Sequence, residues 1–105
     1  MDERRNSQRI EIKQPIATSD ERSLVLGELF DVSREGVGFY SDSAFALDST
    51  LFVVFSGNDK LRENEFEVMV VRCVEDSNAP MKYRVSAAHV DANMKYLEDL
   101  LSLNS

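Results

Sequence analysis

The chain has 105 residues, 43% of them hydrophobic, which is enough for one buried core and no second domain. Twelve lysines and arginines against 19 aspartates and glutamates give a net charge of −7, which opposes unspecific binding to DNA, RNA or anionic membranes. The single cysteine, Cys73, excludes an internal disulfide. No apolar run reaches the roughly 20 residues of a membrane helix, and no secretory signal is visible. We therefore expect one cytoplasmic domain over residues 1–105, without membrane insertion.

The first third of the chain combines a polar arm with two expected strands. Residues 1–8 contain no apolar side chain after Met1, so we expect a mobile arm there. Alternation of Ile10, Ile12 and Ile16 predicts a first strand, which Pro15 should place at an edge or end. Residues 23–32 alternate in the same way and form the second expected strand.

Four further strands are expected between residues 37 and 90. The third covers 37–41, and a connection over 43–49 should fold Phe45 and Leu47 onto the core. The fourth, 51–55, is apolar on both faces, as expected where both faces are covered. The fifth, 65–75, shifts its apolar phase to Val71 and Cys73, which predicts a bulge. Tyr83 begins the alternation of the last strand.

Helical periodicity replaces alternation after residue 90. Asp91 is a plausible N-cap, and an apolar stripe at helical spacing follows within residues 91–104. Short strands at this spacing, closed by one helix, predict an all-β fold: a six-stranded antiparallel barrel over residues 9–90 with a C-terminal helix.

Two short motifs flank the expected first and second strands. The first is an R-x-x-x-R pattern, Arg5 and Arg9; the second is D-x-S-x-x-G, formed by Asp31, Ser33 and Gly36. Arginine can fork onto a phosphate and stack on a purine, while an aspartate accepts the paired N–H groups of a guanine edge. A serine hydroxyl can bind a phosphate oxygen or a ring nitrogen, and glycine permits a tight turn and close approach of a ligand. Without ligand, Asp31 and the arginines could pair with each other.

Together, the two motifs resemble the sequence pattern of PilZ domains, bacterial receptors for cyclic di-GMP. The opening Glu3 to Ile10, the Gly36-Val37-Gly38-Phe39 run and the leucine-rich C-terminus also resemble that family. The resemblance implies a six-stranded barrel of the split-barrel type with a C-terminal helix. It also implies that Arg5 and Arg9 hold the phosphates and guanine faces of cyclic di-GMP, with Asp31, Ser33 and Gly36 contacting it from the barrel. No cofactor or metal is implied.

Three residues extend or depart from the family pattern. In the family, the residue before the first motif arginine influences ligand stoichiometry, so Arg4 implies two cyclic di-GMP molecules per chain. His89 stands where phenylalanine is frequent; its phase points inward, which favours a satisfied, partly buried histidine over a ligand contact. Arg34 is expected to be solvated rather than to reach a phosphate.

The same residues also bear on competing functions. One histidine and one cysteine leave no metal cluster, Cys73 lies among apolar neighbours, and no phosphate loop or nucleophile elbow is present, so an enzyme is not expected. The main interpretation is a receptor whose ligand-ordered face is read by an unidentified downstream protein. The runner-up is an adaptor that works through protein contacts without nucleotide. A barrel for single-stranded nucleic acid ranks last, because the surface is acidic and the aromatic residues occupy apolar phases.

Overall fold

The computed structural model describes residues 9–20, 23–56 and 65–90, which contain six strands and no helix. The strands are β1 (Ile10–Ser19), β2 (Leu24–Val32), β3 (Gly36–Ser41), β4 (Thr50–Phe55), β5 (Glu65–Glu75) and β6 (Tyr83–His89). The arm expected over 1–8 and the helix expected over 91–104 lie outside the described residues. Within the described ranges, no helix is long and apolar enough to cross a membrane.

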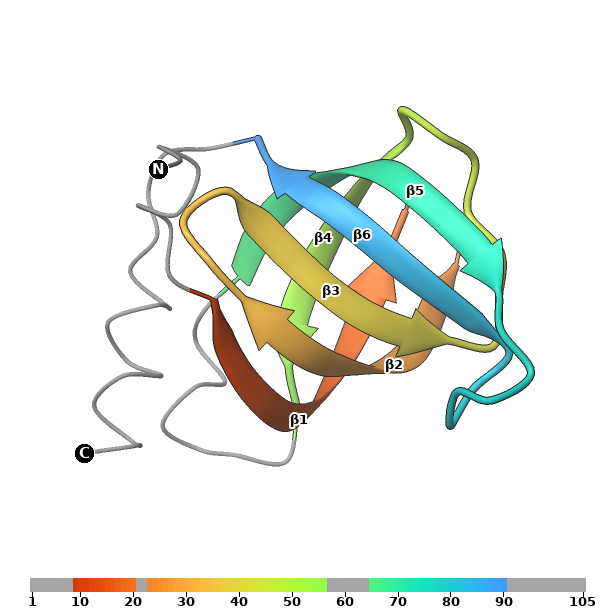
Figure 1. Ribbon diagram of the computed structural model, residues 1–105. Helices are drawn as coiled ribbons and strands as arrows, with labels where there is room; N and C mark the ends of the chain where they lie inside the picture. The colour runs from red at the N-terminus through yellow and green to blue at the C-terminus, as the bar shows by residue number, and fades with distance from the viewer. Residues whose placement is uncertain (1–8, 21–22, 57–64, 91–105) are drawn as a thin grey trace, which may run out of the picture.

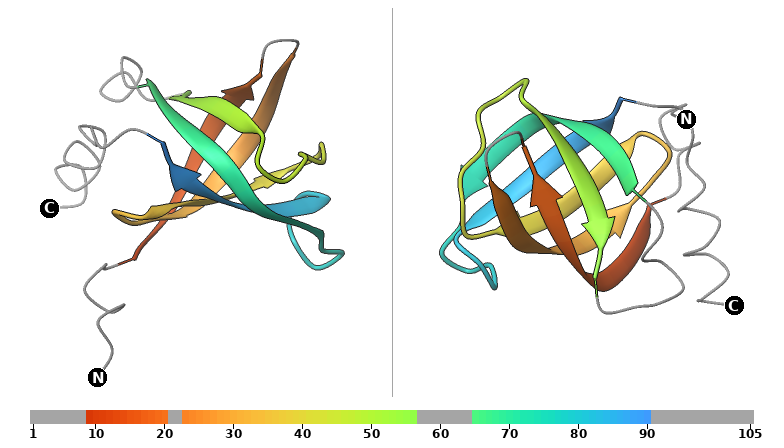
Figure 2. Two further views of the ribbon diagram at one scale, coloured as in Figure 1. Left: turned by 90° about the horizontal axis from the view of Figure 1, so that it is seen from above. Right: turned by 180° about the vertical axis from the view of Figure 1, so that it is seen from behind.

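The six strands form a closed antiparallel barrel in the order β1-β2-β3-β6-β5-β4 (Figures 1 and 2). β4 closes the ring by pairing with β1 from Ile16↔Phe55 to Ser19↔Phe52. Side chains at alternate positions point inward, because successive residues of a strand face opposite sides of the sheet. The fully buried ones are Ile16, Leu29, Val32, Phe39, Leu51, Val53, Val68, Val70 and Val85. The expected six-stranded antiparallel barrel is confirmed.

The bulge expected in β5 is confirmed, although one of its residues behaves differently. Pairing between β5 and β6 shifts between Val70 and Arg72, which leaves Val71 as the extra residue. Val71 is therefore exposed, and its expected place on the inward face is wrong. The inward phase resumes at Cys73, which packs against the core.

Three expectations about the other strands need correction. β1 continues past Pro15 to Ser19; Pro15 lies one position before the pairing with β4 begins, where a missing N–H costs little. Leu47 is 62% exposed; the chain turns directly after it at Asp48, which has a φ of 70° and donates its N–H to Val70 O of β5. Phe45 does pack onto the core, against Phe39. The outer face of β4 is not covered at Phe52, which is 45% exposed.

One end of the barrel gathers segments that are distant in the sequence. Ile10 at the start of β1 pairs with Val32 at the end of β2, and Gly36 at the start of β3 pairs with Ala88 near the end of β6. The β2–β3 turn thus lies between the start of β1 and the end of β6 (Figure 1). This end carries Arg9 and the second motif, Asp31, Ser33 and Gly36.

Candidate functional site

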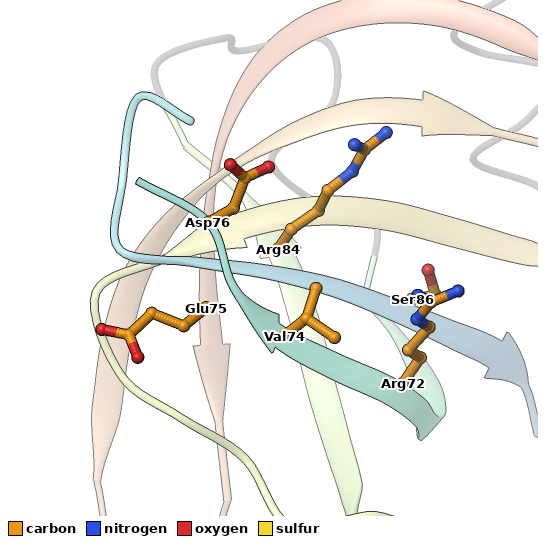
Figure 3. A pocket seen from close by; sticks show the side chains of 6 residues that line it. All are labelled: Arg72, Val74, Glu75, Asp76, Arg84 and Ser86. Atoms are coloured by element: carbon orange, nitrogen blue, oxygen red, sulfur yellow. The ribbon is translucent and has the colours of Figure 1, made fainter. Parts of the chain in front are cut away.

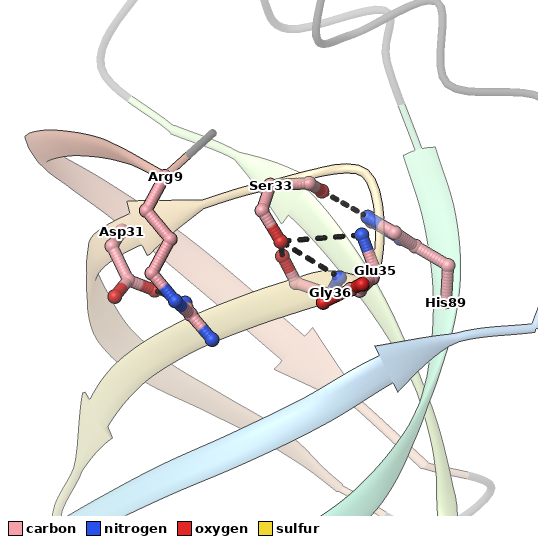
Figure 4. Close-up of polar contacts among 6 residues, drawn as sticks. All are labelled: Arg9, Asp31, Ser33, Glu35, Gly36 and His89. Carbon is pink, nitrogen blue, oxygen red and sulfur yellow. Dashed lines mark hydrogen bonds and ion pairs between the residues drawn. The ribbon is translucent and has the colours of Figure 1, made fainter. Parts of the chain in front are cut away.

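The turn between β2 and β3 is organised by the hydroxyl of Ser33 (Figure 4). Ser33 Oγ accepts hydrogen bonds from Glu35 N (3.2 Å) and Gly36 N (3.3 Å) and lies 3.4 Å from Gly36 O, to which it donates. Ser33 N also donates to Gly36 O at 2.9 Å. Ser33 is 1% exposed, so its hydroxyl shapes the turn from within. A direct contact between this hydroxyl and a ligand stays a prediction.

Gly36 is required by the neighbouring strand. A Cβ atom at this position would lie 2.1 Å from the main-chain oxygen of Ala87 on β6, a distance that no side chain tolerates. The sequence suggests a tight turn as the reason for this glycine, but the backbone of Gly36 does not adopt the positive φ that would demand a glycine there. The glycine instead lets β3 approach β6 closely at the point where the turn ends.

Arg9 and Asp31 join the first motif to the second. Arg9 Nη1 lies 3.0 Å from Asp31 Oδ1, with side chains that are 60% and 18% exposed (Figure 4). This confirms that the motifs can pair without ligand. Asp31 Oδ1 is buried and has no hydrogen-bond partner among the described residues, so the contact is an ion pair without hydrogen-bond alignment. Leaving a buried acceptor such as Asp31 Oδ1 without a hydrogen bond costs free energy of folding.

Gly38 makes room beside the Asp31 carboxylate. A Cβ atom there would lie 2.6 Å from the ring of Phe30 and 2.9 Å from Asp31 Oδ1. The Phe30 ring packs on Tyr40, with centroids 4.6 Å apart, and the Arg84 guanidinium lies 5.1 Å from its centre. Such a cation–π contact holds Arg84 over the sheet. The result is an aromatic and cationic surface next to the carboxylate of Asp31.

A groove continues this surface across the outside of β5 and β6. Strand register places Gly38 opposite both Asp31 and Ser86, and Ser86 opposite Arg72, so these four residues form one row across the sheet. The groove has a volume of about 400 Å³. It is lined by Arg72, Val74, Glu75, Asp76, Arg84 and Ser86 (Figure 3).

The cations of this groove, Arg72 and Arg84, were not singled out from the sequence. Their outward phase in alternating strands is visible there, since Val85 and Cys73 next to them point inward. Their position on the same outer face as Asp31 depends on the strand order β2-β3-β6-β5, which places distant segments side by side. The sequence therefore indicates that both arginines are exposed, but it does not indicate where on the barrel they lie.

Three further arginines were considered in the sequence: Arg4, Arg5 and Arg34. Arg4 and Arg5 lie outside the described residues. Arg34 is exposed, in agreement with the expected solvated side chain. Among the described residues, no group of three or more histidine, cysteine or acidic side chains could hold a metal ion.

His89, at the end of β6, is partly buried and hydrogen-bonded, as its phase predicted. Its Nε2 atom lies 3.1 Å from Ser33 O, and its ring edge contacts Phe66, with centroids 5.7 Å apart. Burial lowers the pKa of His89 below its ordinary value of 6.5, and the bond to the Ser33 carbonyl offsets part of that shift. The imidazole is therefore neutral at pH 7.

Comparison with known proteins assigns the fold and the family. Residues 3–103 match the family model of the PilZ domain. The fold is similar to the inhibitor of motility MotI/DgrA of Bacillus subtilis (TM-score 0.70, 16% identity), covering 96% of this chain and 49% of that one. It is also similar to the PilZ domain of YcgR from Escherichia coli, solved with c-di-GMP (TM-score 0.69, 16% identity), covering 96% of this chain and 88% of that one. A search of curated proteins finds no match. The chain belongs to the PilZ domain family.

Proposed function

We propose that this PilZ domain is a receptor for cyclic di-GMP, acting in the cytoplasm and without catalysis. The observation that carries the proposal is Asp31 Oδ1, a buried acceptor that contacts Arg9 yet lacks a hydrogen bond within the described residues. The N1–H and exocyclic N–H groups of a guanine edge are donors of the kind that this acceptor needs. The structure of YcgR from Escherichia coli with c-di-GMP supports the choice of ligand.

Binding would exchange partners at this ion pair. A guanine edge would replace Arg9 as the partner of Asp31, and the released guanidinium would fork onto a phosphate of the same ligand. Because Arg9 is 60% exposed, its pairing with Asp31 contributes little and is easily given up. Arg5, four residues earlier in the arm, would hold the ligand from the other side.

The groove beyond Gly38 offers space for more than one guanine. Its two arginines suit phosphates, and its acidic residues, Glu75 and Asp76, suit the N–H donors of a base. We place a second cyclic di-GMP molecule there, intercalated with the first and held by Arg4. Ordering of the arm over this face would change its shape and charge, and a downstream protein would recognise the change.

The test is an NMR titration of the ¹⁵N-labelled chain with cyclic di-GMP, with cyclic di-AMP as the matched control. Adenine has an acceptor at N1 where guanine has a donor, so it cannot satisfy Asp31 in the same way. We expect saturable changes in the chemical shifts of the Asp31, Gly38 and Ser86 amides with cyclic di-GMP and none with cyclic di-AMP. Shifts scattered over the whole barrel, or equal responses to both nucleotides, would count against the proposal.

An adaptor function without nucleotide is the second candidate, and one observation favours it. Leu24 and Phe52 are exposed on the two strands that flank Ser19, and Leu26 is exposed next to Leu24 on the same face of β2. Exposed apolar groups that lie together often mark protein interfaces. Absence of nucleotide binding, together with a partner contact abolished by Leu26→Ser, would favour the adaptor over the receptor.

A further inference from the structure

Two hydrogen bonds connect the end of β6 to the β2–β3 turn. His89 N donates to Glu35 O at 3.1 Å, and the ring atom Nε2 lies 3.1 Å from Ser33 O (Figure 4). Any residue other than proline can make the first bond. The second requires a side chain at position 89 that both reaches the turn and donates a hydrogen bond.

The turn directs the carbonyl of Ser33 toward this donor. The amide and hydroxyl of Ser33 are both used inside the turn, on Gly36 and Glu35, which leaves its main-chain oxygen to bond outside it. A carbonyl oxygen can only accept, so Nε2 of His89 must carry the proton. Since the imidazole is neutral at pH 7, it is the Nε2–H tautomer that bonds to Ser33.

We propose that His89 is a positioning residue for the ligand site, holding the turn that follows Asp31 in its binding-competent conformation through the Ser33 carbonyl. Asp31 lies two residues before Ser33, and Gly36 begins the strand that passes beside the Asp31 carboxylate. Loss of the donor leaves a buried carbonyl unsatisfied, so the turn would open more often. The apparent affinity for the ligand is the intrinsic affinity multiplied by the fraction of molecules in which the turn is closed.

Two variants separate the donor from the bulk of the ring. His89→Phe keeps an aromatic ring against Phe66 but has no donor, whereas His89→Gln offers an amide N–H₂ at similar reach. We expect His89→Phe to accelerate hydrogen exchange of the Glu35 and Gly36 amides about three- to tenfold, because exchange follows the population of the open turn. Cyclic di-GMP binding should weaken by the smaller factor by which the population of the closed turn falls. His89→Gln should restore both towards the wild-type values, and the Val85 amide should keep its protection in each variant.

The exchange measurement does not depend on the nucleotide, although the affinity measurement rests on the proposed function. If the wild type binds no cyclic di-GMP, faster exchange in His89→Phe alone would still support the positioning role. The proposal would be overturned if hydrogen exchange of the Glu35 and Gly36 amides were unchanged in His89→Phe. It would also be overturned if exchange in His89→Gln were as fast as in His89→Phe. If the variants fail to fold, ¹⁵N NMR of the His89 imidazole in the wild type tests the proposal instead. An Nδ1–H tautomer at pH 8 would contradict the hydrogen bond from His89 Nε2 to Ser33 O.

Discussion

Arg9 Nη1 contacts Asp31 Oδ1 at 3.0 Å, so the last residue of the arginine motif meets the first residue of the D-x-S-x-x-G motif on the outside of the barrel. Register brings them together: Glu11 of β1 pairs with Asp31, and Arg9 lies two residues before Glu11. In the proposed receptor, this ion pair occupies the position that the ligand would take.

Asp31→Asn should weaken cyclic di-GMP binding at least tenfold. The amide retains one acceptor oxygen but turns two donors toward the guanine, which has donors of its own. The free energy of unfolding should change by less than about 1 kcal/mol, because Arg9 is 60% exposed and the amide keeps one acceptor oxygen. Calorimetry and urea unfolding measure the two effects, with exposed Glu65→Gln as the control. Because loss of one negative charge lowers the repulsion of an anionic ligand, equally weakened binding in Glu65→Gln would contradict a specific role of Asp31.

Alanine at the two glycines of β3 should separate folding from binding. Gly36→Ala drives a Cβ into the backbone of β6 and should lower the free energy of unfolding by about 2–4 kcal/mol. In Gly38→Ala the Cβ meets the Phe30 ring, which can turn away, so about 1 kcal/mol is expected. Gly38→Ala should nevertheless bind ligand more weakly, because it displaces the groups around Asp31. Equal losses of stability in the two variants would contradict this account.

The number of bound ligands should depend on Arg4 and on the groove. Calorimetry should give two cyclic di-GMP molecules per wild-type chain and one per Arg4→Leu chain. Arg84→Ala should also lower the stoichiometry, because it removes a cation from the groove in which the second molecule is placed. Arg34→Ala is the matched control, since Arg34 is exposed on the turn and outside the groove. One ligand per wild-type chain at saturation would rule out the second site.

Acidification should destabilise the fold through His89. Because burial lowers the pKa of His89 in the folded state, the unfolded chain binds its proton at higher pH. The contribution of neutral His89 to the free energy of unfolding is therefore complete above pH 6.5, the ordinary pKa of histidine. It is lost as the pH falls from there toward the lower pKa of His89 in the folded state. The melting temperature should therefore drop more in the wild type than in His89→Gln between pH 7.5 and 5.5. Parallel curves would show that the histidine does not contribute.

Alternation in the sequence predicted the barrel because each strand has one buried face. β5 is the clearest case: its bounds, Glu65 to Glu75, and its bulge follow from the apolar phase alone. Side chains at irregular positions were less predictable. Val71 within the bulge and Leu47 in a loop are both apolar and exposed, since local backbone direction decides their environment.

The motifs identified which residues face each other, but not every role. The Arg9–Asp31 contact was anticipated from opposite charges on neighbouring segments. The inward role of the Ser33 hydroxyl was missed, because a serine in a turn can serve the backbone or a ligand equally well. The location of Arg84 beside Phe30 required the pairing of β3 with β6, which alternation does not reveal.

The most direct measurement is calorimetric titration of cyclic di-GMP into the wild type and into Arg9→Ala. Charge-assisted hydrogen bonds contribute roughly 1.5–3 kcal/mol each, so loss of Arg9 should weaken binding about tenfold to a hundredfold. Saturable binding that weakens by this factor is the predicted result. Absence of binding by a folded wild type at high micromolar nucleotide, or equal affinities of the two proteins, would contradict the receptor function.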